Sequence, residues 1–503
     1  MARLGDILRY GFWSLSALGG LYVLFVASLI HPDVQRFALY AHKISAFWQN
    51  LDRPEAFGFA RNQVTPFNIT TVDGETLYAW HILPLDLYAQ NQEDLTISSA
   101  APVDYLESKP FKLLRDDPEA RLVINFHGNA GHIAQGWRPD TYRALSSLRP
   151  SVPSSACSPS SSSPHTHVLA FDYRGFGRSS GSPSEPGLVA DGVAAARWAI
   201  DVARVEPRRI VLLGQSLGTA VATGVAEAFA LGEVEGAGKA AEGDGHGDGA
   251  AVLEADEEDA QARLGGAIPP AGAAAAQNAW RSRDDDHSSS GSEAEPPPTF
   301  FASLILVSPF TSLPELLHDY RIFGAVPVLN PLKYTHPRVL PFLQRCVRER
   351  WETGERLARA VARAAGAPAG QDPDGGDPPA APRGSAPRFN LHVIHAATDP
   401  DIGFRHGEAV YSAAVRAAAA AREPERRARD RVVSAGRHVV WRAEKGPSRE
   451  EWWGGGDEEE GEGDSGRLGR LGLSVVGFGG HNRVVTYAPV GVAVLRGFEV
   501  GDG

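Results

Sequence analysis

Short apolar runs recur along the chain, and several are continuous rather than alternating between apolar and polar positions. They lie at residues 75–83, 121–126, 167–173, 209–214, 302–308, 390–396 and 473–478. Unbroken runs of this length are typical of strands buried on both faces of a parallel sheet. Helix-like stretches separate them, at residues 188–203, after residue 216 and at 407–421. This alternation predicts an α/β fold with a mostly parallel central sheet and helices on both faces.

The N-terminal part of the chain has a different pattern, because a long segment there carries no charge. This segment is residues 11–30, GFWSLSALGGLYVLFVASLI. A helix of about 20 residues spans the hydrocarbon core of a bilayer, which is about 30 Å thick. The alternative is a cleaved signal peptide, whose apolar core usually has only about 7 to 15 residues. The sequence favours a transmembrane anchor within residues 1–31, whose orientation the flanking basic residues leave undecided.

Apolar residues at helical spacing follow the anchor. They are Val34, Phe37, Ala41, Ile44 and Trp48, and most charged residues lie off this stripe. The spacing predicts an amphipathic juxtamembrane helix within residues 32–54. Two interpretations stay open: the helix packs on its own domain, or it lies in the membrane interface beside the anchor.

Composition changes in four segments that contain few large apolar side chains. These segments are residues 150–165, 231–299, 364–387 and 453–468, and they predict disordered inserts in a single α/β domain covering residues 55–503. Residues 231–299 contain 15 acidic and 4 basic residues, so they hold −11 of the net charge of −12. The rest of the chain is close to neutral, and therefore no nucleic-acid partner is expected.

Two segments match the serine-hydrolase pattern G-x-S-x-G, residues 177–181 and residues 214–218. A nucleophile elbow requires a strand that runs into the serine and a helix that starts just after it. Ser216 has both, since RIVLLG precedes it and LGTAVATGVAEAFA follows it. Ser179 lies beyond the end of its strand and is followed by SGSPSEPG, whose glycines and prolines break a helix. The sequence therefore predicts Ser216 as the nucleophile and Ser179 as a loop residue.

A serine nucleophile needs a base, and the base needs an orienting acid. In folds with this elbow, the acid and then the histidine follow the serine along the chain. Asp399 and Asp401 both follow a predicted strand, and Asp399 is favoured because it lies nearer the strand end. His481 lies in a glycine-rich turn after the last strand. His406 is too close to the acid, and His438 begins an apolar run, so His481 is the predicted base.

An oxyanion intermediate also requires hydrogen-bond donors. The backbone N–H of Leu217, directly after the nucleophile, is one predicted donor. The second is expected in HGNAG, which follows the strand at residues 121–126. We assign the Asn129 N–H, with the Ala130 N–H as the alternative.

Segments on the two edges of a parallel sheet have different expected roles. The inserts that begin near residues 152, 231 and 365 precede strands, so they should emerge opposite the catalytic edge and leave activity intact. Residues 313–360 instead follow the sixth strand and are rich in large apolar side chains, which predicts a lid over an acyl chain. The cysteines, Cys157 and Cys346, form no metal-binding spacing.

With these residues in place, the chain resembles the α/β-hydrolase-domain family, most closely the abhydrolase domain-containing protein 12 group in its fungal form. The motifs that carry the resemblance are NFHGNAGH, FDYRGFGRSSGSPSEPG, GQSLGTAVA, LVSPFTSLPELLHDYRIFGAVPVLNPL, LHVIHAATDPDI and GGHNRVVTYAPVGVAVLRGF. The resemblance implies a membrane-anchored serine hydrolase without cofactor or metal, with Ser216, Asp399 and His481 as its triad. Relatives often carry Asp where this chain has Thr398.

The resemblance also implies a lipid substrate at a membrane, a monoacylglycerol or a lysophospholipid. Alternatives are a thioesterase that acts on palmitoylated proteins from the cytosol, and an inactive membrane scaffold. The sequon Asn68-Ile69-Thr70 is used only in the lumen, which favours a luminal catalytic domain in the endoplasmic reticulum. The sequence carries no indication of the oligomeric state.

Overall fold

The computed structural model describes most of the chain outside the predicted inserts. The described residues are 4–43, 49–97, 104–150, 164–234, 298–322, 326–327, 336, 338–365, 389–429, 438–442, 449–454 and 468–501. The four inserts predicted to be disordered fall almost entirely outside these ranges.

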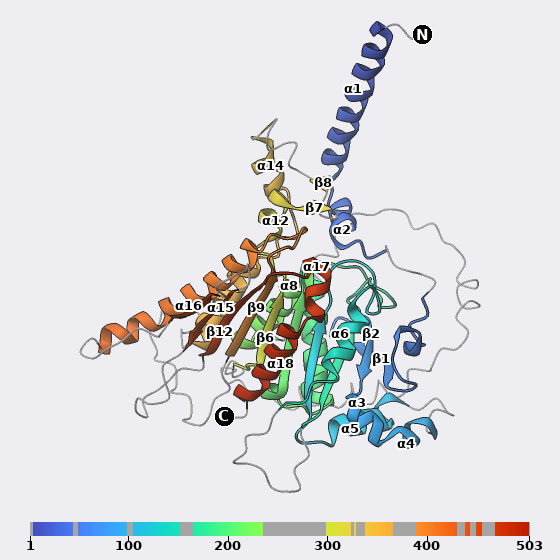
Figure 1. Cartoon of the computed structure of the whole chain (residues 1–503), viewed down its shortest axis with the longest axis vertical. Coiled ribbons are helices and arrows are strands. Elements are labelled where there is room, and N and C mark those ends of the chain that lie inside the picture. The colour runs from blue at the N-terminus through green and yellow to red at the C-terminus, as the bar shows by residue number, and fades with distance from the viewer. Residues whose placement is uncertain are drawn as a thin grey trace, which may run out of the picture.

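A single large sheet organises the domain (Figure 1). In spatial order its strands are β1 (Val64–Thr70), β2 (Thr76–Ile82), β4 (Thr166–Phe171), β3 (Arg121–Phe126), β5 (Ile210–Gln215), β6 (Ser303–Val307), β9 (Phe389–Ala396), β12 (Leu468–Val476), β11 (Arg449–Gly454) and β10 (His438–Arg442). The strands from β4 to β12 in this order pair in parallel, and both flanks are antiparallel. This confirms the predicted mostly parallel sheet, and each predicted apolar run overlaps a strand.

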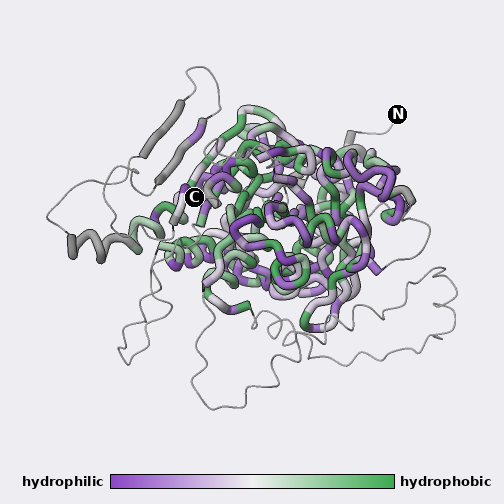
Figure 2. The backbone as a smooth tube through the Cα atoms, turned by 90° about the horizontal axis from the view of Figure 1, so that it is seen from below, coloured by the Kyte–Doolittle hydropathy of each residue, from purple (hydrophilic) through white to green (hydrophobic). Residues whose placement is uncertain are grey.

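The central strands are apolar without interruption because both of their faces are covered. In β5, Leu212 packs in one core cluster, whereas Val211 and Leu213 pack in the other. The first cluster includes side chains of α7 (Glu185–Arg197), α8 (Leu217–Leu231), α15 (Thr353–Ala364) and α16 (Arg405–Arg429), and the second includes side chains of α6 (Arg138–Leu145) and α18 (Ala488–Gly501). Figure 2 shows hydrophobic and hydrophilic stretches alternating along this packed body.

The predicted apolar runs do not include strand β1, and its pattern explains why. Four of its seven residues are not fully buried, and Asn68 and Thr70 are exposed. Pro66 removes one backbone donor, which an edge strand tolerates. A half-exposed edge strand of this kind lacks the continuous apolar signal of the central strands.

The N-terminal helix α1 (Leu4–Ser28) projects away from the domain (Figure 1). Its residues Leu8–Ser28 are long and apolar enough to cross a membrane, and only 6% of the apolar window is buried within the protein. By length and composition, this helix is compatible with a single-pass membrane protein.

Helix α2 (Pro32–Tyr40) is shorter than the predicted amphipathic helix. It ends where Ala41 adopts a left-handed conformation with φ of 45°, and Ile44 and Trp48 lie outside the described residues. Tyr40 is fully buried against the domain, whereas Phe37 is 53% exposed. One side of α2 therefore packs on its own domain and another side faces outward.

The predicted lid corresponds to a segment that follows β6. It contains α12 (Leu313–Asp319), β7 (Arg321–Ile322), β8 (Val326–Pro327) and α14 (Val339–Arg345). Trp351 and Leu357, near the end of the predicted range, are fully buried in the core, and Leu313 and Leu316 of α12 pack in the same cluster. We therefore use "lid segment" for the described residues between 313 and 350, and assign the remainder of the predicted range to the core.

We expect the acidic insert to be dispensable for folding. The chain leaves α8 through Gly232, and the Thr299 N–H donates to the Phe229 carbonyl at 2.9 Å, so the two ends of the insert lie close together. Replacing residues 236–296 by a Gly/Ser linker of about eight residues, which reaches roughly 26 Å, should leave the chain unstrained. The expected midpoint of thermal unfolding lies within about 3 °C of the wild type. A larger drop, or loss of the folded protein, would show that the insert contributes to the core.

Candidate active site

Ser216 lies at the junction between β5 and α8, in a conformation that few residues adopt. Its φ is 53° and its ψ is −121°, and its backbone N–H donates to the Val307 carbonyl at 3.0 Å. A non-glycine residue at positive φ is strained, and such strain is concentrated at functional sites. The turn brings the Ser216 side chain to the carboxyl edge of the sheet.

The two glycines of the motif are required by close backbone contacts. A Cβ on Gly214 would lie 2.4 Å from the Gly218 carbonyl oxygen. A Cβ on Gly218 would lie 2.0 Å from the Phe126 carbonyl oxygen, in the neighbouring strand β3. Both distances are far below van der Waals contact, so neither position accepts a side chain. The G-x-S-x-G pattern here therefore reflects the geometry of a tight strand-to-helix turn.

The structure brings Ser216, His481 and Asp399 into one hydrogen-bonded series. The Nε2 atom of His481 lies 2.8 Å from the Ser216 hydroxyl oxygen, and the Nδ1 atom lies 2.8 Å from Oδ2 of Asp399. With a neutral imidazole, Nδ1–H donates to the carboxylate and Nε2 accepts the hydroxyl proton. The three side chains come from the carboxyl ends of β5, β12 and β9, where the sequence predicts them.

Glycines also shape the turn that carries His481. Gly479, directly before α17 (Gly480–Arg483), has a φ of 125°, and Gly480, the first residue of this helix, has a φ of 59°. A Cβ on Gly479 would lie 2.9 Å from the ring of Tyr487. The Gln215 side chain donates to the His481 carbonyl at 3.2 Å, so the residue before the serine helps hold the histidine turn.

Asp399 is held by groups besides His481. Its Oδ1 atom accepts the backbone N–H groups of Asp401 at 3.0 Å and Ile402 at 2.9 Å. Its Oδ2 atom lies 3.4 Å from Nε2 of His395, a fully buried residue of β9. Burial raises the pKa of the Asp399 carboxyl, but the hydrogen bonds from His395 and His481 outweigh burial and hold this pKa well below its usual range. Asp399 is therefore a carboxylate at neutral pH.

Sequence reasoning missed His395, because a histidine within a buried strand resembles an ordinary core residue. The His395 Nε2–H donates to the Ile402 carbonyl at 2.9 Å. Since a carbonyl only accepts, this bond fixes the proton on Nε2, the atom that also faces Asp399. His395 thereby supports both the loop and the carboxylate.

The pKa of the His481 imidazole is shifted upward by opposing causes. Burial lowers this pKa, whereas the hydrogen bond and the charge of Asp399, followed by the charge of Asp401, raise it above its ordinary value. A buried histidine beside a carboxylate can accept a proton from a hydroxyl and hold it as a stabilised imidazolium. The arrangement thus suits a general base.

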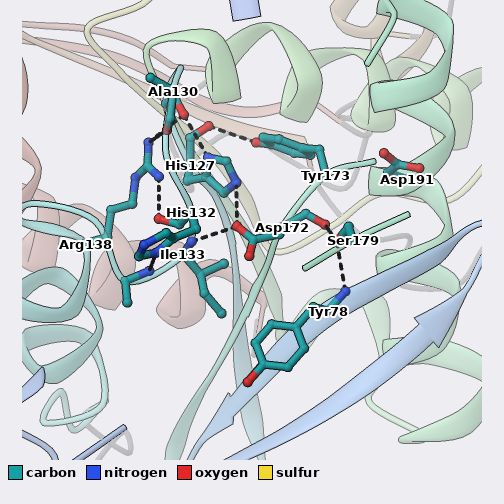
Figure 3. Close-up of polar contacts among 12 residues, drawn as sticks. Tyr78, His127, Ala130, His132, Ile133, Arg138, Asp172, Tyr173, Ser179 and Asp191 are labelled. Carbon is teal, nitrogen blue, oxygen red and sulfur yellow. Dashed lines mark hydrogen bonds and ion pairs between the residues drawn. The ribbon is translucent and has the colours of Figure 1, made fainter. Parts of the chain in front are cut away.

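The HGNAG loop (residues 127–131) lies beside the serine, since a Cβ on Gly128 would be 3.3 Å from the Ser216 Cβ. The guanidinium of Arg138 binds three successive carbonyls of the loop, those of Gly128, Asn129 and Ala130, at 2.8–3.0 Å. Figure 3 shows this contact, together with Arg138 bonding to the His132 carbonyl. Arg138, which sequence reasoning missed, therefore fixes the orientation of the loop's peptide groups.

The two alternative donors of the HGNAG loop differ in their hydrogen bonds. The Ala130 N–H donates to the Tyr40 carbonyl at 3.2 Å and to the Asn129 side chain at 2.8 Å. The Asn129 N–H donates in none of the hydrogen bonds found within the described ranges. Leu217 lies in the first turn of α8, where backbone N–H groups lack helical acceptors. Asn129 and Leu217 therefore remain the predicted oxyanion donors.

Ser179, from the second G-x-S-x-G match, has a different environment. Its hydroxyl donates to the Asp172 carbonyl at 2.6 Å and accepts the Tyr78 N–H at 2.9 Å (Figure 3). Asp172 in turn accepts the Ile133 N–H at 2.7 Å and lies 3.5 Å from Nε2 of His127. The structure therefore places Ser179 in a loop, as predicted. Its hydroxyl links strand β2 to the segment after β4 through these two hydrogen bonds.

Two further features are a cluster of possible metal ligands within the hydrogen-bonded series and a cavity near the lid segment. Ligand atoms of Asp399, Asp401 and His481 lie within 4.8 Å of one another. The hydrogen bond between His481 Nδ1 and Asp399 holds a proton at this place, so the three residues could bind a cation only after losing that proton. A cavity of about 350 Å³ lies where the lid segment meets the start of α16; it is lined by Thr311, Glu315, His318, Gln344, Arg405, His406 and Ala409. Its lining combines apolar surface with charged side chains such as Glu315 and Arg405.

Comparisons with known proteins show which family and which relatives this chain is similar to. A family model described as the alpha/beta hydrolase fold matches residues 121–230, which run from β3 through Ser216 into α8. Lysophosphatidylserine lipase ABHD12 of Danio rerio is 28% identical over 206 residues, 41% of this chain and 45% of that protein. The ABHD12 lipase of Xenopus tropicalis is 30% identical over 236 residues, 44% of this chain and 50% of that protein.

The chain thus spans about half the length of the curated relatives it matches. Among solved structures, an alpha-beta hydrolase from Vibrio vulnificus is similar with 12% identity and a TM-score of 0.39, covering 78% of this chain and 84% of that one. The strand order, the serine turn and the matched segment lead to one conclusion. The chain has the α/β-hydrolase fold, and it is similar in sequence to the ABHD12 lysophosphatidylserine lipases.

Proposed function

We propose that this chain is a membrane-anchored serine hydrolase that cleaves the acyl ester of single-chain lipids, lysophospholipids or monoacylglycerols. The observation that carries the proposal is the hydrogen-bonded series of Ser216, His481 and Asp399 at the carboxyl edge of the sheet. The substrate class is supported by the relatives named as lysophosphatidylserine lipases and by the apolar helix α1.

In the proposed reaction, His481 takes the proton of the Ser216 hydroxyl as its oxygen attacks the ester carbonyl. The N–H groups of Leu217 and Asn129 stabilise the oxyanion that forms. When the tetrahedral intermediate collapses, the imidazolium returns its proton to the leaving glycerol oxygen and an acyl-serine remains. Water, deprotonated by His481, then releases the fatty acid and regenerates the serine.

The proposed substrate has one acyl chain and a polar head, and the site offers distinct surroundings for the two. The lid segment follows β6, and its helix α14 carries Phe342, an apolar side chain that is 57% exposed. The cavity beside α16 presents Arg405, Glu315 and His318, which are groups able to bind a charged head. This region therefore offers both an apolar side chain and charged groups to an amphiphile.

A substrate panel tests the function. The full chain, purified in detergent micelles, is assayed with lysophosphatidylserine, a monoacylglycerol and a palmitoylated peptide thioester. We expect hydrolysis of at least one glycerol ester, with kcat/KM at least about tenfold above that for the thioester. Faster hydrolysis of the thioester would favour the depalmitoylating alternative, and no turnover with any substrate would favour the inactive scaffold.

The raised pKa of His481 predicts where kcat/KM falls on the acid side, or acid limb, of its pH profile. The base works only when its imidazole is neutral, and a raised pKa keeps it protonated up to a higher pH. We expect kcat/KM to rise with pH and reach half its maximum above about pH 6.5, the ordinary value for histidine. Asp401→Asn removes one of the charges that raise this pKa, so the limb should move to lower pH. A limb well below pH 6.5 in the wild type would contradict this assignment.

We further propose that the catalytic domain lies in the lumen of the endoplasmic reticulum, on the evidence of the sequon. Asn68 is exposed on the edge strand β1, where a glycan has room. In membranes from expressing cells, we expect an endoglycosidase-sensitive mass shift that disappears in Asn68→Gln. Absence of the shift in the wild type would favour a cytosolic domain and hence the thioesterase alternative.

A further inference from the structure

The short helix α2 contacts two parts of the active-site edge that are far from it in sequence. Three residues separate it from α1, the candidate membrane span, which ends at Ser28. Its last residue, Tyr40, is fully buried and packs edge-on against Phe176, with ring centroids 6.3 Å apart. Helix α2 is therefore a docked part of the domain that directly continues the membrane segment.

The first contact joins the end of α2 to the HGNAG loop. The Ala130 N–H donates to the Tyr40 carbonyl at 3.2 Å, and the Asn129 side-chain amide donates to the Leu39 carbonyl. The Asn129 side-chain oxygen accepts the Ala130 N–H at 2.8 Å. Arg138 binds the carbonyls of the same loop from another direction. The loop that carries the Asn129 N–H is thus held between α2 and Arg138.

The second contact joins α2 to the end of the lid segment. The Gln35 side chain donates to the Cys346 carbonyl at 2.8 Å and accepts the Arg348 N–H at 3.1 Å. Arg36 donates to Oε1 of Glu349 at 2.9 Å, and the Tyr40 hydroxyl donates to Oε2 at 2.9 Å.

Glu349 is buried, and it anchors this contact in the domain. Its side chain is only 5% exposed, and it also accepts the backbone N–H of Glu185, at the start of α7. A buried carboxylate that loses donors is strongly destabilised, so these bonds favour one position of α2. The base of the lid segment is itself closed by the Leu313 N–H, which donates to the Arg350 carbonyl at 2.8 Å.

We propose that α2 is a positioning element of the active site, in which Tyr40 and Gln35 hold the HGNAG loop and the lid segment in register with Ser216. This inference rests on the proposed function, because it assigns the Asn129 N–H to the oxyanion. Displacement of the loop weakens an interaction made mainly in the transition state, so it lowers kcat more than it raises KM.

Two variants test the proposal on the full chain in detergent micelles, with the soluble ester p-nitrophenyl butyrate. Tyr40→Phe removes the hydroxyl that binds Glu349 and keeps the buried ring, and Gln35→Ala removes both bonds to residues 346 and 348. We expect kcat to fall about 5- to 20-fold in each variant, with KM within about twofold, as for a partly displaced oxyanion donor. Gln35→Glu, which places a carboxylate oxygen against the Cys346 carbonyl, should also lose activity, because the side chain no longer donates to that carbonyl.

The matched control is Phe37→Ala, on the exposed side of the same helix, which should leave kcat unchanged. Thermal unfolding checks that all variants remain folded. Activity within twofold of the wild type in both Tyr40→Phe and Gln35→Ala would overturn the proposal, as would an equal loss in Phe37→Ala. A change in KM alone would also overturn it. If the proposed function itself is wrong, the wild type will show no turnover that depends on Ser216. This outcome differs from failure of the present proposal, in which the wild type is active and the α2 variants keep that activity.

Discussion

The Ser216→Ala variant should lose hydrolysis by a factor of about 10⁴ to 10⁶ in kcat/KM, because it removes the nucleophilic hydroxyl. His481 Nε2 is 2.8 Å from the serine oxygen, and alanine leaves that nitrogen without its proton donor. The measurement is turnover of the best ester from the substrate panel. It is paired with labelling of membranes by a fluorophosphonate, which reacts with activated serines. Both signals should disappear together.

Ser179→Ala is the matched control, since Ser179 satisfies the same five-residue pattern. Its labelling and turnover should equal those of the wild type. Its free energy of unfolding should fall by about 1 to 3 kcal/mol, because the buried Tyr78 N–H loses its acceptor. Labelling that survives in Ser216→Ala, or disappears in Ser179→Ala alone, would contradict the assignment of the nucleophile.

The position of Ser216 could be predicted because its requirements are local. A buried strand, two glycines and a helix-forming segment lie within about twenty consecutive residues, and the structure shows a contact that demands each glycine. Asp399 and His481 are more than 80 residues apart, yet their places follow from a rule of topology. Residues after parallel strands meet at one edge of the sheet.

Arg138, His395 and Glu349 could not be predicted in the same way. Arg138 acts through backbone carbonyls, which carry no sequence signal, and His395 lies inside an apolar strand. Glu349 binds Tyr40 across 309 positions, and that pairing depends on how the lid segment folds back on α2. These contacts arise from tertiary packing, so neither hydrophobic period nor motif spacing indicates them.

The residue at which α2 ends could not be predicted from the local sequence pattern either. The apolar stripe continues past Tyr40 at helical spacing, but the structure ends the helix with a left-handed Ala41. The Leu39 and Tyr40 carbonyls, which a longer helix would use internally, are thereby available to the HGNAG loop. Tertiary hydrogen bonds here override the helical pattern.

Asp399→Asn should lower kcat by a factor of about 10⁴. The cause is a change in the tautomer of the His481 imidazole, and the fold should stay intact. The Oδ1 position accepts two backbone N–H groups, from Asp401 and Ile402, so the amide oxygen of an asparagine stays there. The NH₂ group then replaces Oδ2 and faces His481 Nδ1. Because this NH₂ group donates, Nδ1 of His481 must accept and therefore carries no proton. The neutral imidazole then has its proton on Nε2. The nitrogen that should accept the Ser216 proton is then blocked.

Asp401→Asn separates this effect from a general loss of negative charge. Asp401 raises the pKa of His481 through its charge, whereas the carboxylate 2.8 Å from Nδ1 belongs to Asp399. We therefore expect less than about a tenfold loss of kcat in Asp401→Asn when each protein is compared on the high-pH plateau of its own profile, where the imidazole is neutral. Steady-state kinetics of both variants, with thermal unfolding as a check on folding, decide between the two acids. A loss in Asp401→Asn as large as in Asp399→Asn would move the orienting role to Asp401.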